Sequence, residues 1–196
     1  AKRVRVMDNP FGGTPASAYA ISGIESAVKS AGGEMEIMSP VKYAQFDIPD
    51  GKDITSWTFY RDILETDVLI DVPIAKHHSL ARLTLGGKNL LGVITTPNQI
   101  HRNLGQRIAD LVSRVRPTLT VVDAFRILKA HGPTGGNLND VEQSQTVIAS
   151  HDIVAADAYA ATLFGLTGAD ISYIKAAADM GLGTLDLNSV KVEEIS

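Results

Sequence analysis

The stretch that decides the fold prediction runs from Val68 to His78 and reads VLIDVPIAKHH. Its first five residues form an apolar run that only Asp71 interrupts and that a proline ends. A short Val/Leu/Ile run of this kind predicts a strand that is buried on both faces, as in a parallel sheet. The polar residues KHH come shortly after this run. We therefore expect them to lie beyond the carboxyl end of a buried strand, where open α/β sheets bind their ligands.

Similar strands alternate with helical patterns along the rest of the chain. The other predicted strands are Val4–Met7, Met35–Met38, Leu119–Val122, Thr146–Ala149 and Val190–Ile195. The predicted helices are Ala16–Ala31 (ended by Gly32-Gly33), Trp57–Glu65, Ile100–Val115, Ala155–Phe164 and Ile171–Met180, and residues 39–55 show no regular pattern. This alternation predicts an α/β fold with a doubly wound, mostly parallel sheet and helices on both faces, a three-layer sandwich. A single domain over residues 1–196 is the simplest organisation.

The composition is that of a globular domain, with 44% hydrophobic and 20% charged residues. The net charge of −4 argues against a nucleic-acid partner, because a nucleic-acid coat needs a basic surface. No apolar run approaches the roughly 18 residues of a membrane-spanning helix. We expect a soluble domain without a membrane span, and leave its compartment open between the cytoplasm and export after removal of a signal. The absence of cysteine excludes disulfides, thiolate catalysis and iron–sulfur clusters ligated within this chain.

The most unusual feature is a basic stretch, Val72–Ala109, that contains no Asp or Glu. Its cations are Lys76, Arg82, Lys88, Arg102 and Arg107, and its histidines are His77, His78 and His101. Cations without local counter-ions raise the local potential and attract phosphate, carboxylate or another anion. The alternative is that these cations pair with acids distant in sequence, such as Asp8, Asp71 or Asp123. We favour the functional interpretation, because several of the cations follow the end of a predicted strand.

Two segments of the basic stretch contain candidate ligand-binding residues. The first is Lys76-His77-His78, where adjacent histidines in extended backbone would point to opposite faces, so we expect only one of them to face a site. The second is Gly86-Gly87-Lys88-Asn89, where glycines allow the backbone to approach a ligand closely. His101 is a possible second nitrogen ligand, and an exposed histidine at a helix start is an equally good interpretation.

Two later segments add further groups. The loop His131–Gly136 follows the strand that ends at Asp123, so in a parallel sheet it should lie on the same edge as Lys76. A flexible loop without a function is an equal alternative. Asp152 is expected to cap the helix that follows it. Asp157 is expected to be either a carboxylate of the site or a buried partner of a basic residue.

These residues resemble a known family. Residues 67–78, followed by Gly87-Lys88-Asn89-Leu90-Leu91-Gly92, resemble the core signature of the family called domain of unknown function 362. Val122-Asp123-Ala124, Gly132–Gly136, Asp152 with Asp157-Ala158, and Gly181-Leu182-Gly183 fit the same family in order, so the resemblance covers nearly the whole chain. The matching residues are Lys76, His78, Lys88, Asn89, Asp123, Gly132, Gly136, Asp152 and Asp157.

The family resemblance also has implications outside these residues. Its members often carry a cysteine-rich ferredoxin-like region or a twin-arginine export signal, and neither pattern occurs in these 196 residues. Members usually have an upstream Lys-Pro-Asn motif as well. We therefore expect that an upstream segment of the full-length family is missing here and that it helps to complete the site.

A shorter likeness is to the nickel-pincer lactate racemase group. In that group a histidine precedes a Gly-Gly-x-Lys-type turn and another histidine follows it, and His78, Lys88 and His101 occur in this order here. The likeness implies that the lysine holds an organometallic cofactor and that the histidines serve as metal ligands or as an acid and base.

The leading hypothesis is a domain that binds a small anion, with or without a divalent metal or metallo-cofactor. Lys76 and Lys88 would hold negative charge, His78 and Lys88 would be the catalytic groups, and His78 with His101 would bind the metal. The remaining predicted ligand-binding residues are Gly87, Asn89, Asp123, Gly132, Gly136 and Asp157. Two rival hypotheses stay open. One is an accessory module that docks with an iron–sulfur or other redox protein partner, and the other is a racemase- or oxidoreductase-like enzyme with a nickel cofactor.

Overall fold

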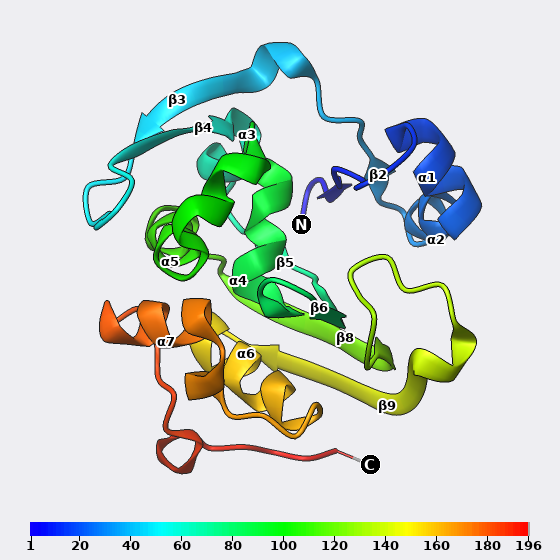
Figure 1. Cartoon of the computed structure of the whole chain (residues 1–196). Helices are drawn as coiled ribbons and strands as arrows, with labels where there is room; N and C mark the ends of the chain where they lie inside the picture. Colours follow the sequence, from blue (N-terminus) through cyan, green and yellow to red (C-terminus); the bar gives the residue numbers. More distant parts are fainter. Residues whose placement is uncertain (196) are drawn as a thin grey trace.

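The computed structural model describes residues 1–195 as a mixed α/β fold (Figure 1). The strands are β1 (Arg5–Val6), β2 (Glu34–Met35), β3 (Tyr43–Asp47), β4 (Ser56–Tyr60), β5 (Ile70–Asp71), β6 (Ile74–His78), β7 (Arg82–Thr84), β8 (Leu119–Leu128) and β9 (Val141–Ser150). The helices are α1 (Pro15–Ser22), α2 (Ile24–Ser30), α3 (Arg61–Glu65), α4 (Gly86–Asn89), α5 (Leu104–Val115), α6 (Ile153–Thr162) and α7 (Ser172–Asp179). No helix in this part of the chain is both long and apolar enough to cross a membrane. The predicted α/β class is confirmed.

The main sheet has five strands and is mixed. The long strand β8 pairs in parallel with β5 and β6 on one side and antiparallel with β9 on the other, and β7 forms an antiparallel hairpin with β6. Helix α6 packs against β8 and β9, and α7 packs against α5 (Figure 1). Two further two-stranded sheets, β1–β2 and β3–β4, stand apart from the main sheet.

One face of the main sheet is covered and the other is open. On the covered face, Asp71 is paired in register with Thr120, and both are buried. On the open face, Ile70, Ile74 and Val147 are 51%, 54% and 63% exposed. The register places Ile74 and Val147 on either side of Asp123, because Ile74 pairs with Asp123 and Asp123 pairs with Val147, while Ile70 pairs with Leu119 earlier in β8. The predicted helical layer on both faces of the sheet is therefore not found within residues 1–195.

Long-range strand pairing changed several local predictions. The segment that begins at Trp57, predicted as a helix, instead starts as part of β4, because Phe46 and its neighbours in β3 supply antiparallel partners. Strand β8 does not end at Asp123 but continues to Leu128 along β9. Val190–Ile195, predicted as a strand, has no pairing partner and lies in irregular structure. Each correction depends on whether a partner strand is present elsewhere in the chain, which local pattern does not reveal.

The first predicted helix is split in two. Thr14 caps α1 through a capping box with Ser17. Gly23 then adopts a left-handed conformation, with φ of 77°, and ends α1 before α2 begins. Gly32, with φ of 81°, follows the end of α2, as the sequence predicts.

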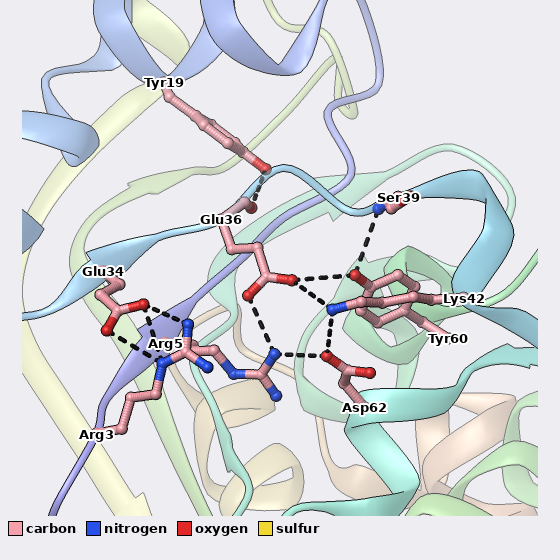
Figure 2. Close-up of polar contacts among 9 residues, drawn as sticks. All are labelled: Arg3, Arg5, Tyr19, Glu34, Glu36, Ser39, Lys42, Tyr60 and Asp62. Carbon is pink, nitrogen blue, oxygen red and sulfur yellow. Dashed lines mark hydrogen bonds and ion pairs between the residues drawn. The ribbon is translucent and has the colours of Figure 1, made fainter.

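A network of ion pairs fastens the N-terminal β1–β2 sheet to the segment around β4 and α3 (Figure 2). The Arg5 guanidinium contacts Glu36 at 3.0 Å and Asp62 at 2.5 Å. The Lys42 ammonium contacts the same two carboxylates, at 3.0 and 2.8 Å. The Tyr60 hydroxyl donates a hydrogen bond to Glu36 at 3.2 Å. The two cations and two carboxylates thus form a closed ring between segments that are far apart in sequence.

Candidate functional site

The predicted site residues Lys76, His77 and His78 lie within β6, not beyond the end of a strand. Pairing with β7 extends the strand past Pro73, with Lys76 opposite Thr84 and His78 opposite Arg82. His78 is buried, at 8% exposure, whereas His77 is half-buried. The two adjacent histidines therefore have different environments.

Backbone contacts define how His78 can act. Its Nδ1 accepts hydrogen bonds from the backbone N–H groups of Leu80 (3.1 Å) and Ala81 (3.2 Å). A neutral imidazole has one N–H group, so a ring that accepts at Nδ1 carries its proton on Nε2 and donates from there. The pKa of His78 is lowered to about 4, mainly by burial and in addition by the charges of Lys88, His101, Lys76 and His77. At neutral pH, His78 is therefore an uncharged hydrogen-bond donor.

Gly86 and Gly87, expected from the sequence to lie in a turn, are instead the first residues of α4, and Asp157, a buried residue of α6, accepts hydrogen bonds from their backbone N–H groups. The Gly86 N–H donates to Oδ1 of Asp157 at 2.7 Å, and the Gly87 N–H donates to Oδ2 at 2.8 Å. A Cβ at Gly86 would lie 2.9 Å from Asp157 Oδ1 and 3.0 Å from Asp71 Oδ2. These glycines thus allow close approach by two carboxyl groups of the protein itself. Asp157 is a buried partner of backbone amides, not of a basic residue.

Two carboxyl groups lie next to Gly86, and burial raises the pKa of both. Burial raises the pKa of Asp157 to about 8, against the opposing effect of its two backbone hydrogen bonds. Burial likewise raises the pKa of Asp71 to about 7. Asn89 donates to Oδ1 of Asp71 at 2.8 Å, while Oδ2 of Asp71 is buried without a hydrogen-bond partner. The helix α4, which carries Lys88, therefore begins beside two acids whose pKa values are raised into the neutral range.

Lys88 is a half-buried cation to which no carboxylate of residues 1–195 comes within ion-pair distance. The pKa of Lys88 is lowered to about 8, mainly by desolvation and in addition by the neighbouring charge of Lys76. Lys76 likewise makes no ion pair within the described residues. His101 is exposed on the 3₁₀ segment Pro97–Asn103, yet its charge also lowers the pKa of His78. The structure thus brings Lys76, Lys88 and His101 near His78.

Other cations of the basic stretch do have acidic partners. Arg82 approaches Asp170 at 3.6 Å, and Arg107 pairs with Asp53. The alternative that the cations pair with distant acids therefore holds for these two arginines, although with other acids than Asp8, Asp71 or Asp123. It does not hold for Lys76 or Lys88.

The remaining predicted residues divide into two groups. Gly132 reaches β6: its N–H donates to Nδ1 of His77 at 3.0 Å, and its carbonyl accepts from Ser79 at 3.3 Å. Asp123 lies in the middle of β8 and accepts a hydrogen bond from the backbone of Phe125. Gly136 has no atom near the position that a Cβ would take. Of these three, Gly132 alone has a contact that links it to the histidines.

Asp152 caps α6, as predicted. Its Oδ1 accepts from the backbone N–H groups of Val154 and Ala155, at 2.8 and 2.9 Å. Its Oδ2 accepts from Thr184 at 2.9 Å, which joins the later part of the chain to this cap. Asp152 therefore has a structural role.

A pocket beside the two histidines was not predicted from the sequence. Its volume is about 240 Å³, and its lining residues are His77, His78, Ser79, Arg82, Leu83, Lys129, Phe164 and Leu166. Arg82 could have been singled out, since it belongs to the basic stretch. The sequence around Lys129 and Phe164 does not mark them as site residues, because they reach the pocket from the end of β8 and from beyond α6.

A metal centre made of three or more His, Cys, Asp or Glu side chains is not found among residues 1–195. His78 and His101 are the pair predicted to bind a metal. Because Nδ1 of His78 is engaged by two backbone N–H groups, a metal would have to bind at Nε2 and displace the proton there.

Fold and candidate site together describe a mixed α/β domain in which a half-buried lysine of α4 lies near a buried histidine of β6. The chain belongs to the family described as "Domain of unknown function (DUF362)", whose model matches residues 1–162. This match confirms the family resemblance seen in the sequence. It leaves the nickel-pincer likeness as a prediction.

A relative from Synechocystis is described as "Thylakoid-associated protein sll1697". The two sequences are 24% identical over 133 residues, which cover 62% of this chain and 40% of the relative. The aligned part of this chain thus spans well under half the length of that relative. No solved structure matches the chain.

Proposed function

We propose that this domain binds a small anion between Lys76, His78 and Lys88. The observation that carries the proposal is the half-buried Lys88, which has a second lysine as its neighbour and no carboxylate within ion-pair distance in residues 1–195. Two close cations repel each other, and burial adds a desolvation cost for the charged form. A bound anion would relieve both costs. His78 would add a neutral Nε2–H donor.

The surrounding residues support this assignment. Asp157 holds Gly86 and Gly87, and Asn89 contacts Asp71, so the backbone next to Lys88 is held by buried hydrogen bonds. The raised pKa values of these two carboxyl groups reduce their negative charge near neutral pH, so they compensate the positive charge of Lys88 only in part. The hydrogen bond from the Gly132 N–H to Nδ1 of His77 orients the His77 ring beside the proposed site.

An anion is favoured over a metal as the primary ligand. His78 and His101 would supply at most two ligands, and His78 offers a protonated Nε2 at neutral pH. A divalent metal, a nickel cofactor or a docked redox partner therefore each require groups beyond the described histidines. Binding of a divalent metal is therefore tested in a separate titration. The thylakoid association in the relative's name would fit a docking role, but no contact in this chain supports it more than the anion site.

The test is calorimetric titration with inorganic phosphate. Wild type should bind phosphate, and Lys88→Ala should lose at least about tenfold in affinity, which corresponds to 1.4 kcal/mol. Lys175→Ala is the matched control, because it removes the same charge from an exposed site where Lys175 pairs with Asp179. A Lys88→Ala protein that binds phosphate as wild type does would overturn the proposal. A parallel titration with Ni²⁺ or Zn²⁺ alone tests the metal arm.

The pKa of Lys88 predicts how binding depends on pH. An anion prefers the protonated amine, so affinity should fall as pH rises through about 8, and binding near pH 8 should take up protons. Proton uptake is measured by repeating the titration in two buffers of different ionisation enthalpy. Lys88→Arg stays protonated and should flatten the pH dependence. A wild-type affinity that stays constant from pH 7 to pH 9.5 would contradict the role of Lys88.

A further inference from the structure

The pocket of about 240 Å³ beside the histidines has a lining of unusual composition. It lies between the β6–β7 hairpin, the residue that follows β8 and the segment that follows α6. None of its lining residues is acidic, and neither Lys76 nor Lys88 is among them. His78 is the residue that this pocket shares with the proposed anion site.

The polar part of the lining consists largely of hydrogen-bond donors. Nδ1 of His77 accepts from Gly132, and Nδ1 of His78 accepts from Leu80 and Ala81, so each neutral ring carries its proton on Nε2. Arg82 adds a guanidinium that is 51% exposed; it donates a hydrogen bond to the backbone carbonyl of Asp170 and lies 3.6 Å from the carboxylate of the same residue. A ligand that satisfies such a lining must be rich in acceptors, as a carboxylate is.

Lys129 adds positive charge at the other side of the pocket. Its ammonium donates to the carbonyl of Leu163 at 2.7 Å and lies 3.4 Å from Glu142. It also stands 5.2 Å from the centre of the Phe164 ring. These contacts hold Lys129 in place against an aromatic surface.

The rest of the lining is apolar. Leu83 is buried, at 1% exposure, and Phe164 and Leu166 are half-buried. A compact inorganic anion would leave this surface in contact with water, whereas an apolar group on the ligand would cover it. The volume of about 240 Å³ lies below the roughly 300–1,000 Å³ of pockets for drug-sized molecules and suits a small ligand.

We infer that this pocket binds a small organic acid with a short apolar or aromatic body. Its carboxylate would face the guanidinium of Arg82, with His77 and His78 as further polar residues of the lining. Its apolar body would lie against Leu83, Phe164 and Leu166. The inference deepens the proposed function by naming a ligand class, and it rests on that proposal only in the shared residue His78.

The experiment compares three probes (benzoate, acetate and inorganic phosphate) by ligand-observed NMR and calorimetry on the intact protein. Wild type should bind benzoate more tightly than acetate, because only benzoate covers the apolar wall. Arg82→Gln should weaken benzoate binding by about tenfold or more. Phe164→Ser should remove the preference for benzoate over acetate. Lys175→Ala should change neither, and thermal melts identify any variant that has lost its fold.

The outcomes separate this inference from the proposed function. Benzoate binding that survives Lys88→Ala while phosphate binding is lost supports two distinct sites. Benzoate binding in a wild type that ignores phosphate supports the pocket and refutes the anion site at Lys88. If wild type does not prefer benzoate to acetate, or if folded Arg82→Gln binds benzoate unchanged, the inference fails. If Arg82→Gln does not fold, the test is the NMR spectrum of wild type. Benzoate should then shift the ring signals of His77 and His78, and the absence of such shifts also refutes the inference.

Discussion

Among single residues, we expect the protonation of Asp71 to have the clearest effect on how the free energy of unfolding depends on pH. It is buried, at 6% exposure, with one oxygen bonded to Asn89 and the other without a partner. Its pKa is raised from 3.8 to about 7 by burial. The folded protein therefore binds a proton at Asp71 between about pH 4 and pH 7 that the unfolded chain has released. In this window stability falls as pH rises.

Replacing Asp71 by asparagine should remove this dependence on pH. Asp71→Asn has no charge to desolvate, so we expect it to raise the free energy of unfolding by about 1–3 kcal/mol at pH 8. At pH 4, where Asp71 is protonated in the folded protein, the gain should disappear. Urea unfolding at both pH values measures the difference, with Asp67→Asn as the exposed control. Equal stability of wild type and Asp71→Asn at pH 8 would show that Asp71 carries no raised pKa.

Among the elements, the contact between β6 and the loop after β8 has the clearest consequence. A Cβ at Gly132 would overlap the backbone carbonyl of His77, and the N–H of Gly132 orients the His77 ring. The backbone at this point has no freedom to move away without breaking its hydrogen bonds to β6. This glycine is therefore required by a close approach of two backbone segments.

We expect Gly132→Ala to detach the loop from β6. The free energy of unfolding should fall by about 1–3 kcal/mol, because the loop must shift and buried polar groups lose partners. The His77 ring signal in NMR should move as its hydrogen bond is lost. Gly12→Ala is the matched control, since nothing lies within 4 Å of the Cβ that it would add. If Gly132→Ala leaves both the melting temperature and the His77 signal in place, the loop contact has no structural role.

For the whole molecule, the ion-pair ring of Arg5, Glu36, Lys42 and Asp62 decides how the N-terminal sheet is held (Figure 2). These side chains are only partly exposed, so salt screens their attraction less than at the surface. Hydrogen bonds from Lys42 and Arg5 lower the pKa of Asp62. The stabilisation is thus present above about pH 4 and is lost as Asp62 is protonated at lower pH.

Asp62→Asn should remove one negative corner of this ring. We expect a loss of about 1–2 kcal/mol at pH 7, and a loss near zero at a pH low enough to protonate Asp62 in wild type. In Asp62→Asn, amide hydrogen exchange should accelerate more in β1 and β2 than in β8. Glu34→Gln is the control, because Glu34 forms an exposed pair with Arg3 outside the ring. Equal exchange in β1 for Asp62→Asn and wild type would mean that the ring does not hold this sheet.

The sequence by itself determined the α/β class, the family, several helix caps and the acid-free stretch around Lys88. Helix caps such as Asp152 and Gly32 depend on neighbours a few residues away, so local patterns predict them. The basic stretch is equally visible, because a run without acids is a property of the chain before it folds.

Tertiary structure alone decided the mixed sheet and the chemistry of the groups within it. The antiparallel partners of β6 and β8 lie in the β7 hairpin and in β9, and pairing with them moved Lys76–His78 and Asp123 from strand ends into strands. The tautomer of His78 depends on two backbone N–H groups of its own hairpin, and the raised pKa of Asp71 depends on burial against Gly86. Pairing and burial join residues distant in sequence, and the free energy of a charge depends on those surroundings. For that reason the sequence could name the residues of the candidate site, while their protonation states and the pocket beside them could not be predicted from it.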